Sequence, residues 1–271
     1  MSFKAIKRVL ILAFVIIVIY FFANFNFSSF SFFETKFPNL TAPKEVTYTW
    51  SYNGDDYKIS KTLYGSVYDY YSNKPTSYTY YSDEIPDDWI TDYYSMFLNI
   101  NEKDNSISDL LEDLKAKAVN NNLNKDQTVE FVLSFVQSIE YDSSLADKVL
   151  SDEDGVKYPY MVLYDNSGTC SGKSFLAYKL LDELGYGVAL FDYEVDEHVA
   201  VAIKCDSKNS SYESGYCYAE TTAKNPIGII ADFDENNIGG AFSYLDKNNG
   251  IQSGDVNIYL KTEGKSYSGV R

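Results

Sequence analysis

Apolar and polar residues alternate along the chain after its first forty positions. In EVTYTWSYNGDDYKISKTLYG, residues 45–65, two runs rich in Tyr, Thr and Ile flank Asn53-Gly54, a dipeptide typical of tight β-hairpins. The Tyr-rich pattern continues through SVYDYY to YTYYSDEIP. We therefore predict a β-rich region over residues 45–87, in which cross-strand aromatic pairs explain the many tyrosines.

The pattern takes on a helical period between Asp88 and Tyr141. One stretch has apolar residues three and four positions apart, with Ser106 as a candidate N-cap, at Ile107, Leu110, Leu111 and Leu114. A second stretch has the same spacing at Val129, Val132, Leu133 and Val136. These spacings predict two helices, each with one buried face.

Residues 142–155 are acidic and are predicted to form a solvated loop. The SDEDG sequence within them is similar to part of a calcium loop, but the remaining ligand positions and the distal Glu are missing. Further along, SFLAYKLLDELG has a helical apolar face that stops at Gly185. The chain after Asp192 has the alternation of antiparallel strands.

An unbroken apolar run, Val9–Ala23, follows a short basic start. With the aromatic residues just after it, this run predicts a membrane-spanning signal anchor over 9–27, a cytoplasmic tail over 1–8 and a stalk over 28–44. A cleaved signal peptide is the alternative, although no A-x-A-like cleavage site follows cleanly. Because the basic residues lie on the amino side, we expect a single-pass protein of the cell membrane whose main part is extracellular.

The acidic charge lies entirely outside the predicted anchor. The 271 residues are 45% hydrophobic, enough for one good-sized core. The first 33 contain no acid, so the remainder carries all 39 acidic residues and 20 of the 23 basic ones, a net charge of −19. This charge repels nucleic acid and anionic lipid surfaces, and neither is expected as a partner of the outer domain. Solubility at a crowded cell surface explains it.

The stretch NSGTCSGKSF, residues 166–175, ends like the phosphate-binding loop G-x-x-x-x-G-K-[ST]. YMVLYD before it and VALFD after it could supply the flanking strands of a nucleotide-binding domain. However, Ser167 occupies the position of the first glycine, and the later antiparallel pattern lacks repeated strand-helix-strand units. We therefore take Cys170 as the functional residue of this loop.

Cys170 lies between Gly168 and Gly172 at the amino end of the predicted helix. That end favours a thiolate, and the small neighbours leave room for a substrate carbonyl near the sulfur and the backbone N–H groups. A nucleophilic thiol needs a base, and His198, the single histidine, opens the apolar strand HVAVAIK. Glu220, in YCYAETT on the next strand, is the candidate acceptor that orients this base.

The order of Gly168-Thr169-Cys170, a strand headed by His198, and an acid on the following strand resembles the transglutaminase-like superfamily, especially its archaeal extracellular branch. The similarity covers about residues 45–230 and includes FVQSIEYD, YPYMVL, LLDELGYGVAL and YAETTAKNPIG. It implies an α+β fold with a papain-related core over 88–235. In that core the helix bearing the nucleophile packs on an antiparallel sheet, and a C-terminal β extension follows over 236–271.

The resemblance implies that Cys170, His198 and Glu220 are catalytic. Thiol chemistry of this type requires no metal or other cofactor, so none is expected. The expected enzyme acts on peptide or isopeptide amides of protein substrates, and is more a peptidase than a crosslinking transglutaminase. The family often has acids around the cysteine, whereas this chain has Thr169 and Gly172. The alternative is a catalytically inactive surface module that binds through the tyrosine-rich region. Metal ligation by the Cys, His and Glu is a third interpretation, although they make a thin site.

Cys205 and Cys217 flank the turn between the strands of His198 and Glu220, and a disulfide there would suit an extracellular protein. A directly opposed bridge and a directly opposed His-Glu pair need registers that differ by four residues along one strand, or about 13 Å. We give priority to the register of the His-Glu pair and leave the disulfide open. Both registers put that pair on one face of the sheet and the cysteines on the other.

Overall fold

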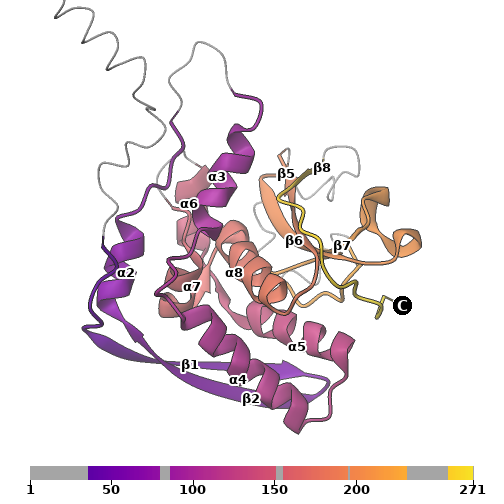
Figure 1. The fold of residues 1–271 in the computed structure, drawn as a ribbon, viewed down its shortest axis with the longest axis horizontal. Helices are drawn as coiled ribbons and strands as arrows, with labels where there is room; N and C mark the ends of the chain where they lie inside the picture. Colours follow the sequence, from indigo (N-terminus) through magenta and orange to yellow (C-terminus); the bar gives the residue numbers. More distant parts are fainter. Residues whose placement is uncertain (1–35, 80–85, 151–154, 195, 231–255, 271) are drawn as a thin grey trace, which may run out of the picture. The chain divides into compact units, whose positions relative to one another are not determined.

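The computed structural model describes residues 36–79, 86–150, 155–194, 196–230 and 256–270. Contacts divide the chain into Met1–Lys36 and a compact unit, Phe37–Arg271, which contains every element described below (Figure 1). The predicted tail and anchor, residues 1–8 and 9–27, lie outside the described residues. Within the described stretches, none of the helices has the length and apolar character needed to cross a bilayer.

The predicted hairpin is confirmed. Strand β1 (Pro43–Tyr52) pairs antiparallel with β2 (Asp55–Tyr64). Asn53 and Gly54 join the strands with φ angles of 53° and 89°, because a two-residue hairpin turn of this kind needs a left-handed backbone at both positions. From Val46 onward every second residue of β1 is buried, so one face of the hairpin packs against the core.

The prediction that the β pattern continues past the hairpin is wrong, because Gly65–Ser72 forms helix α2. Val67 and Tyr71 lie four positions apart and are both buried, which is the spacing of one helix face. The hydroxyl of Tyr71 donates to Asp104 Oδ2 over 2.7 Å. A tyrosine has an apolar ring and a polar hydroxyl, so a run of tyrosines fits a strand and a helix equally well. Residues 80–85 of the same region lie outside the described residues.

Three helices follow, which are α3 (Trp89–Leu98), α4 (Ser106–Asn120) and α5 (Lys125–Ser138). The second and third confirm the predicted pair, and the apolar residues that predicted them are buried. Ser106 is not the N-cap of α4, because Asn105 occupies that position. The N–H of Ser106 donates instead to Asp104 Oδ1 over 3.0 Å. The helix therefore starts one residue earlier than the sequence indicates.

Two shorter helices lie before the cysteine. Helix α6 (Ser143–Leu150) corrects the loop prediction for this part of the chain, and it starts where Asp142 Oδ1 accepts the N–H of Leu145 over 3.1 Å. Residues 151–154, which contain the calcium-like acids, lie outside the described residues. Helix α7 (Pro159–Asp165) covers the YMVLYD segment. A nucleotide-binding domain would need that segment as a strand, so the helix removes the phosphate-loop alternative.

A four-stranded antiparallel sheet with the order β7-β6-β5-β8 completes the unit. Its strands are β5 (Val188–Tyr193), β6 (His198–Lys204), β7 (Tyr216–Ala219) and β8 (Val256–Tyr259). Helix α8 (Cys170–Glu183) packs on β5 and β6 (Figure 1). Gly185, the residue after its C-cap, has a φ of 84° and terminates the helix. A short parallel pair, β3 (Glu140–Tyr141) and β4 (Ser167–Gly168), precedes it. The chain thus has the predicted mixture of helices and antiparallel sheet.

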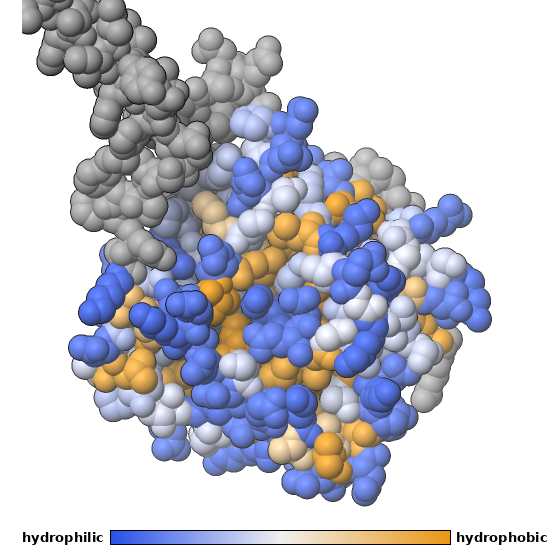
Figure 2. Space-filling model, in the orientation of Figure 1, coloured by the Kyte–Doolittle hydropathy of each residue, from blue (hydrophilic) through white to orange (hydrophobic). Residues whose placement is uncertain are grey.

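Both faces of this sheet are covered. Val199, Val201 and Ile203 of β6 belong to the main core, which includes the apolar residues of α8. Alternate residues such as Ala200 and Ala202 belong to a second, smaller cluster. Polar side chains occupy most of the face seen in Figure 2, with an apolar band across its middle. Of the predicted C-terminal extension, β8 is an edge strand of the same sheet, and residues 236–255 lie outside the described residues.

Candidate active site

The three predicted site residues come together at one end of the sheet. Cys170 is the first residue of α8, His198 is the first residue of β6, and Glu220 follows the last residue of β7. Because β6 and β7 are antiparallel, the start of one adjoins the end of the other, and α8 packs on β6. His198 is 4% exposed and Glu220 is fully buried, whereas Cys170 is partly exposed. Only the thiol is open to a substrate.

His198 and Glu220 form a buried pair, with 3.2 Å between His198 Nε2 and Glu220 Oε2. The other carboxylate oxygen, Oε1, accepts the N–H of Thr221 over 2.8 Å. It also accepts both the N–H and the hydroxyl of Thr222 over 2.7 Å. Burial raises the pKa of Glu220, but His198 and these hydrogen bonds outweigh it and hold the pKa below its usual value. The acid is therefore a fixed carboxylate.

His198 also contacts the thiol. Burial lowers the pKa of His198, but the charge of Glu220 and the hydrogen bonds with Cys170 and Glu220 dominate and raise it. Since Nε2 faces the carboxylate, the nitrogen left for Cys170 is Nδ1. In this arrangement one ring nitrogen of His198 faces the carboxylate of Glu220, and the other can accept the proton of the Cys170 thiol.

The start of α8 is left open at the thiol. Thr169 is the N-cap but makes no capping hydrogen bond with its side chain. Its Oγ1 is instead 3.1 Å from Ser171 Oγ, and both side chains are buried. The first N–H groups of a helix have no partner within the helix and carry partial positive charge. They can therefore bind an oxyanion formed next to the sulfur.

The glycines on either side of the cysteine serve packing, which differs from the expectation that they make room for a substrate. A Cβ on Gly168 would lie 3.1 Å from Val162 Cγ2 of helix α7. A Cβ on Gly172 would lie 3.1 Å from the same methyl group and 3.2 Å from the carbonyl oxygen of Lys157. A side chain at position 172 would therefore require Val162 and the backbone at Lys157 to shift by a few tenths of an ångström.

Ser174 links the three elements of the site, a role that its place in the phosphate-loop pattern did not indicate. Its Oγ lies 2.9 Å from the carbonyl oxygen of Val199, the residue after His198. The same oxygen lies 3.0 Å from Thr221 Oγ1, in the residue after Glu220. Its position one helical turn after Cys170 is the only sign of this role in the sequence.

Lys173 was assigned to a phosphate loop in the rejected alternative, and the structure gives it a different position. Its side chain is fully buried, and Nζ lies 2.5 Å from the carbonyl oxygen of Ile139 and 3.4 Å from that of Gln137. Burial lowers the pKa of Lys173 to about 8, although the charges of Glu220 and Cys170 oppose this shift. A second cation therefore accompanies His198 among the anions of the site.

Gln137, at the end of α5, holds the chain that follows the acid. Its Nε2 donates to the carbonyl oxygens of Glu220 over 3.0 Å and of Asn225 over 2.9 Å. Both donor hydrogens of the amide are thus used on backbone carbonyls. The contact fixes the segment 220–225 and leaves no donor of this amide for an oxyanion.

Three tyrosines of the front region are buried, and their hydroxyl groups bind other parts of the same unit. The hydroxyl of Tyr48 donates to the carbonyl oxygen of Leu163 over 2.8 Å. That of Tyr52 donates to Glu130 Oε2 over 2.8 Å. Tyr71, described above, is also buried. The fold therefore accounts for these three tyrosines, whose rings and hydroxyl groups are not available to a partner.

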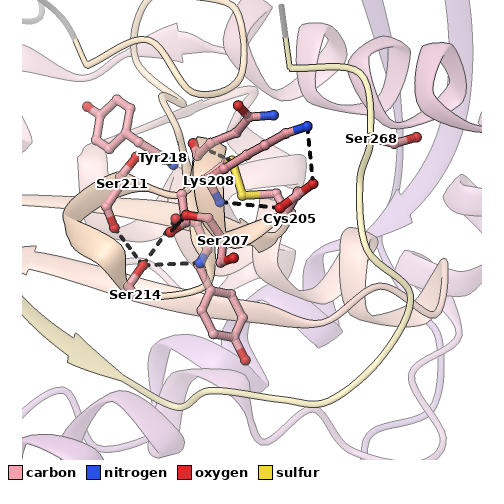
Figure 3. The surroundings of a disulfide bond; sticks show 12 residues. Cys205, Ser207, Lys208, Ser211, Ser214, Tyr218 and Ser268 are labelled. Atoms are coloured by element: carbon pink, nitrogen blue, oxygen red, sulfur yellow. Dashed lines mark hydrogen bonds and ion pairs between the residues drawn. A yellow bond between two sulfur atoms is a disulfide. The ribbon is translucent and has the colours of Figure 1, made fainter.

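Cys205 and Cys217 form a disulfide with 5.8 Å between their Cα atoms (Figure 3). The ladder of β6 and β7 pairs Ile203 with Cys217, so Cys205 lies two residues beyond the position opposite its partner. The ladder also pairs Val201 with Ala219, so the next residue of β7, Glu220, lies opposite Ala200, which is two residues after His198 on β6. The register is thus midway between the two considered from the sequence, and both pairs are diagonal neighbours. The two pairs lie on opposite faces, as both registers predicted.

The loop closed by this disulfide folds back on itself. It contains the short helices η2 (Ser207–Asn209) and η3 (Ser211–Glu213). Ser214 Oγ donates to the carbonyl oxygen of Ser211 over 2.7 Å, and Ser211 Oγ accepts the N–H of Tyr218 over 3.1 Å (Figure 3). The loop therefore supports the strand that leads to Glu220.

In the stretches that the structure describes, no group of three His, Cys, Asp or Glu side chains is arranged to hold a metal ion.

Comparisons with known proteins add little to this geometry. No family model and no curated protein matches the chain. A solved structure described as "Crystal structure of a TGase" is similar over 70% of this chain and 46% of that chain, with 16% identity and a TM-score of 0.36. The chain thus spans less than half the length of that protein. Because a likeness at this level carries no argument, the case for a function comes from the site itself.

Proposed function

We propose that the chain is a cysteine-dependent acyl transferase or hydrolase of the transglutaminase-like type, with peptide or isopeptide amides as substrates. One observation carries this proposal. Cys170, partly exposed at the start of α8, interacts with a buried imidazole that forms a pair with a buried carboxylate. An accessible thiol, a base and an orienting acid are the groups that nucleophilic acyl transfer requires.

In the proposed reaction, Cys170 Sγ attacks the amide carbonyl carbon while His198 Nδ1 takes the thiol proton. The N–H groups at the start of α8 bind the oxyanion of the tetrahedral intermediate. As the C–N bond breaks, His198 gives the proton to the leaving amine, and a thioester remains on Cys170. Attack by water, with its proton passing to His198, releases the acid and restores the thiol. Attack by a second amine would instead give a new amide.

We favour water as the acceptor, and therefore a peptidase, because of the sequence resemblance described above. The location is also part of the proposal: residues 9–27 anchor the chain in the cell membrane, and the remainder faces outward. The disulfide between Cys205 and Cys217 supports an oxidising compartment, since such bonds are rare in the cytosol. With those two cysteines joined, Cys170 is the free thiol of the chain.

The first test is the labelling of Cys170 in the full-length protein. Iodoacetamide alkylation should be fast well below about pH 8, where an ordinary thiol with a pKa of about 8.5 reacts slowly. The variant His198→Ala should lose this fast reaction. Labelling in the wild type that only rises near pH 8.5 and ignores His198 would contradict the proposal and leave the inactive binding module.

A second test detects acyl transfer without knowledge of the natural substrate. Wild-type protein mixed with p-nitrophenyl acetate should release a burst of one nitrophenolate per chain, and acid quenching should trap one acetyl group on Cys170. Cys170→Ser, which changes only the nucleophilic atom, should show neither. Adding a primary amine such as glycine amide then separates the outcomes. An acetylated amine indicates transfer, and free acetate indicates hydrolysis.

A further inference from the structure

A tyrosine hydroxyl contacts both members of the buried His-Glu pair. Tyr218, on β7 two residues before the acid, is fully buried. Its hydroxyl donates to Glu220 Oε2 and lies 3.4 Å from His198 Nε2. The same carboxylate oxygen is 3.2 Å from His198 Nε2. One carboxylate oxygen is therefore shared by the phenol and the imidazole.

The chemistry of these groups fixes where the protons lie. Glu220 is an acceptor when ionised, so the phenol O–H of Tyr218 donates to it. The phenol oxygen then presents only lone pairs to His198 Nε2. Nε2 therefore faces two acceptors and carries a hydrogen, which leaves Nδ1 as the nitrogen that accepts the thiol proton.

We propose that Tyr218 is a positioning residue of the acyl-transfer site. It selects the tautomer of His198 with the hydrogen on Nε2, and it weakens the electrostatic attraction between Glu220 and the imidazolium. This inference rests on the proposed function. By donating to Oε2, the phenol takes up part of the charge that would otherwise bind the imidazolium. A less tightly held imidazolium returns its proton to a leaving amine and regains the neutral form that activates water.

The position of Tyr218 is held by other contacts. Its N–H donates to Ser211 Oγ, and its ring lies edge-on to Tyr193 at 6.1 Å between centroids. Tyr193 in turn lies 6.0 Å from the His198 ring and has its hydroxyl 3.3 Å from that of Tyr212. The titratable groups that face this assembly are Cys170 and Lys173 from α8, Asp192 and Tyr193 from β5, Tyr212 from η3, and Glu220.

The single histidine makes a direct measurement possible. With ¹⁵N-labelled histidine the full chain gives one imidazole signal set, which reports both the tautomer and the pH of titration. We would compare Tyr218→Phe with Tyr216→Phe in a Cys170→Ala background, where the thiol no longer contributes. Tyr216 is the matched control, because it lies two residues away on β7 and its hydroxyl donates to the carbonyl oxygen of Thr262 over 2.9 Å.

We expect Nε2–H as the neutral tautomer in the parent, and an upward shift of the imidazole midpoint by at least about 0.5 pH unit in Tyr218→Phe. The charge returned to Oε2 outweighs the loss of the weaker 3.4 Å contact. Tyr216→Phe should leave the midpoint unchanged. An unshifted or lowered midpoint in Tyr218→Phe, with the fold intact by circular dichroism, would overturn the proposal.

A kinetic readout separates this inference from the proposed function. With Cys170 intact, Tyr218→Phe should keep the nitrophenolate burst, because that leaving group needs no proton, but should slow the later turnover about tenfold. Equal loss of both phases would indicate disruption rather than positioning, and would count against the proposal. If the wild type gave no burst, the proposed function would fail, while the imidazole midpoint would still decide the role of Tyr218.

Discussion

Lys173 lies in α8, one helical turn after Cys170, and its Nζ is 2.5 Å from the carbonyl oxygen of Ile139. Ile139 is the C-cap of α5, so the ammonium group sits at the negative end of that helix. The contact places a fully buried charge under the site. Its main cost is desolvation, which lowers the pKa of Lys173 to about 8 from the model-peptide value of 10.5.

This pKa predicts a pH-dependent stability. A lysine whose pKa is lower in the folded than in the unfolded chain destabilises the fold while it is charged in both states, and the penalty is relieved as pH rises from about 8 to about 10.5. Between about pH 7.5 and 9.5, the free energy of unfolding of the wild type should therefore rise by about 1 to 2 kcal/mol relative to Lys173→Met. Guanidinium unfolding at the two pH values measures this difference. Lys115→Met, which removes an exposed ammonium, should show no such change, and parallel pH profiles for all three proteins would refute the prediction.

Replacing Ser174 should weaken both the fold and the reactivity of the thiol. Ser174→Ala removes the hydroxyl that joins α8 to the residues after His198 and Glu220, at a cost of about 1 to 3 kcal/mol for buried groups left unpaired. The alkylation rate of Cys170 at pH 6 should fall several-fold. Ser138→Ala is the matched control, because its hydroxyl donates only to the carbonyl oxygen of Phe135 within its own helix. Equal alkylation rates in the two variants would show that Ser174 has no influence on the site.

The diagonal position of Glu220 predicts that aspartate cannot replace it. Diagonal neighbours on adjacent strands are about 7 to 8 Å apart, farther than directly opposed residues, so the extra methylene of Glu is needed to reach His198. Glu220→Asp should therefore slow Cys170 alkylation at pH 6 at least about tenfold, comparable to Glu220→Gln. Glu220→Gln keeps the length and loses the charge, so the two variants separate reach from charge. Wild-type rates in Glu220→Asp would mean that the strands shift to accommodate the shorter acid.

Removing the disulfide should cost stability before it costs function. The bond closes a loop with a sequence separation of 12, for which the chain-entropy estimate is about 3 kcal/mol. The double variant Cys205→Ser, Cys217→Ser should unfold at correspondingly lower guanidinium concentration. Dithiothreitol should destabilise the wild type similarly but leave the double variant unchanged. A response of the double variant to the reductant would show that the effect does not come from this bond.

The elements found correctly in the sequence are those with a long, unambiguous period. The hairpin around Asn53-Gly54 and helix α4 each present one apolar face over many residues. The apolar spacing of α5 and α8 is equally long, although these two helices are buried on more than one side. Helices α2, α3, α6 and α7 were not predicted, because each is only seven to ten residues long. In α2 the tyrosines fit two periods, and α6 lies within a segment whose acidic composition indicated a loop. Short elements are decided by packing rather than by local pattern.

Within the site, the sequence indicated the groups with reactive chemistry but not those that hold them. Cys170, His198 and Glu220 could be named because a thiol, a lone imidazole and an acid each stood at the end of a predicted element. Tyr218 and Ser174 could not be named, because their role depends on the register of β6 and β7 and on the seat of α8 against them. The register of β6 and β7 depends on the length of the Glu220 side chain, on the loop between the strands and on the disulfide between Cys205 and Cys217. None of these three fixes the register alone.

The diagonal ladder also ties together two choices that look independent along the chain. If the acid were an aspartate, β7 would have to slip by two residues to bring it opposite His198, and Cys217 would then be carried too far from Cys205 for a bond. To keep the disulfide, the second cysteine would have to lie two positions closer to Cys205 in the sequence. Acid length and cysteine spacing should therefore covary among natural sequences that share this hairpin, glutamate with the present spacing and aspartate with the shorter one.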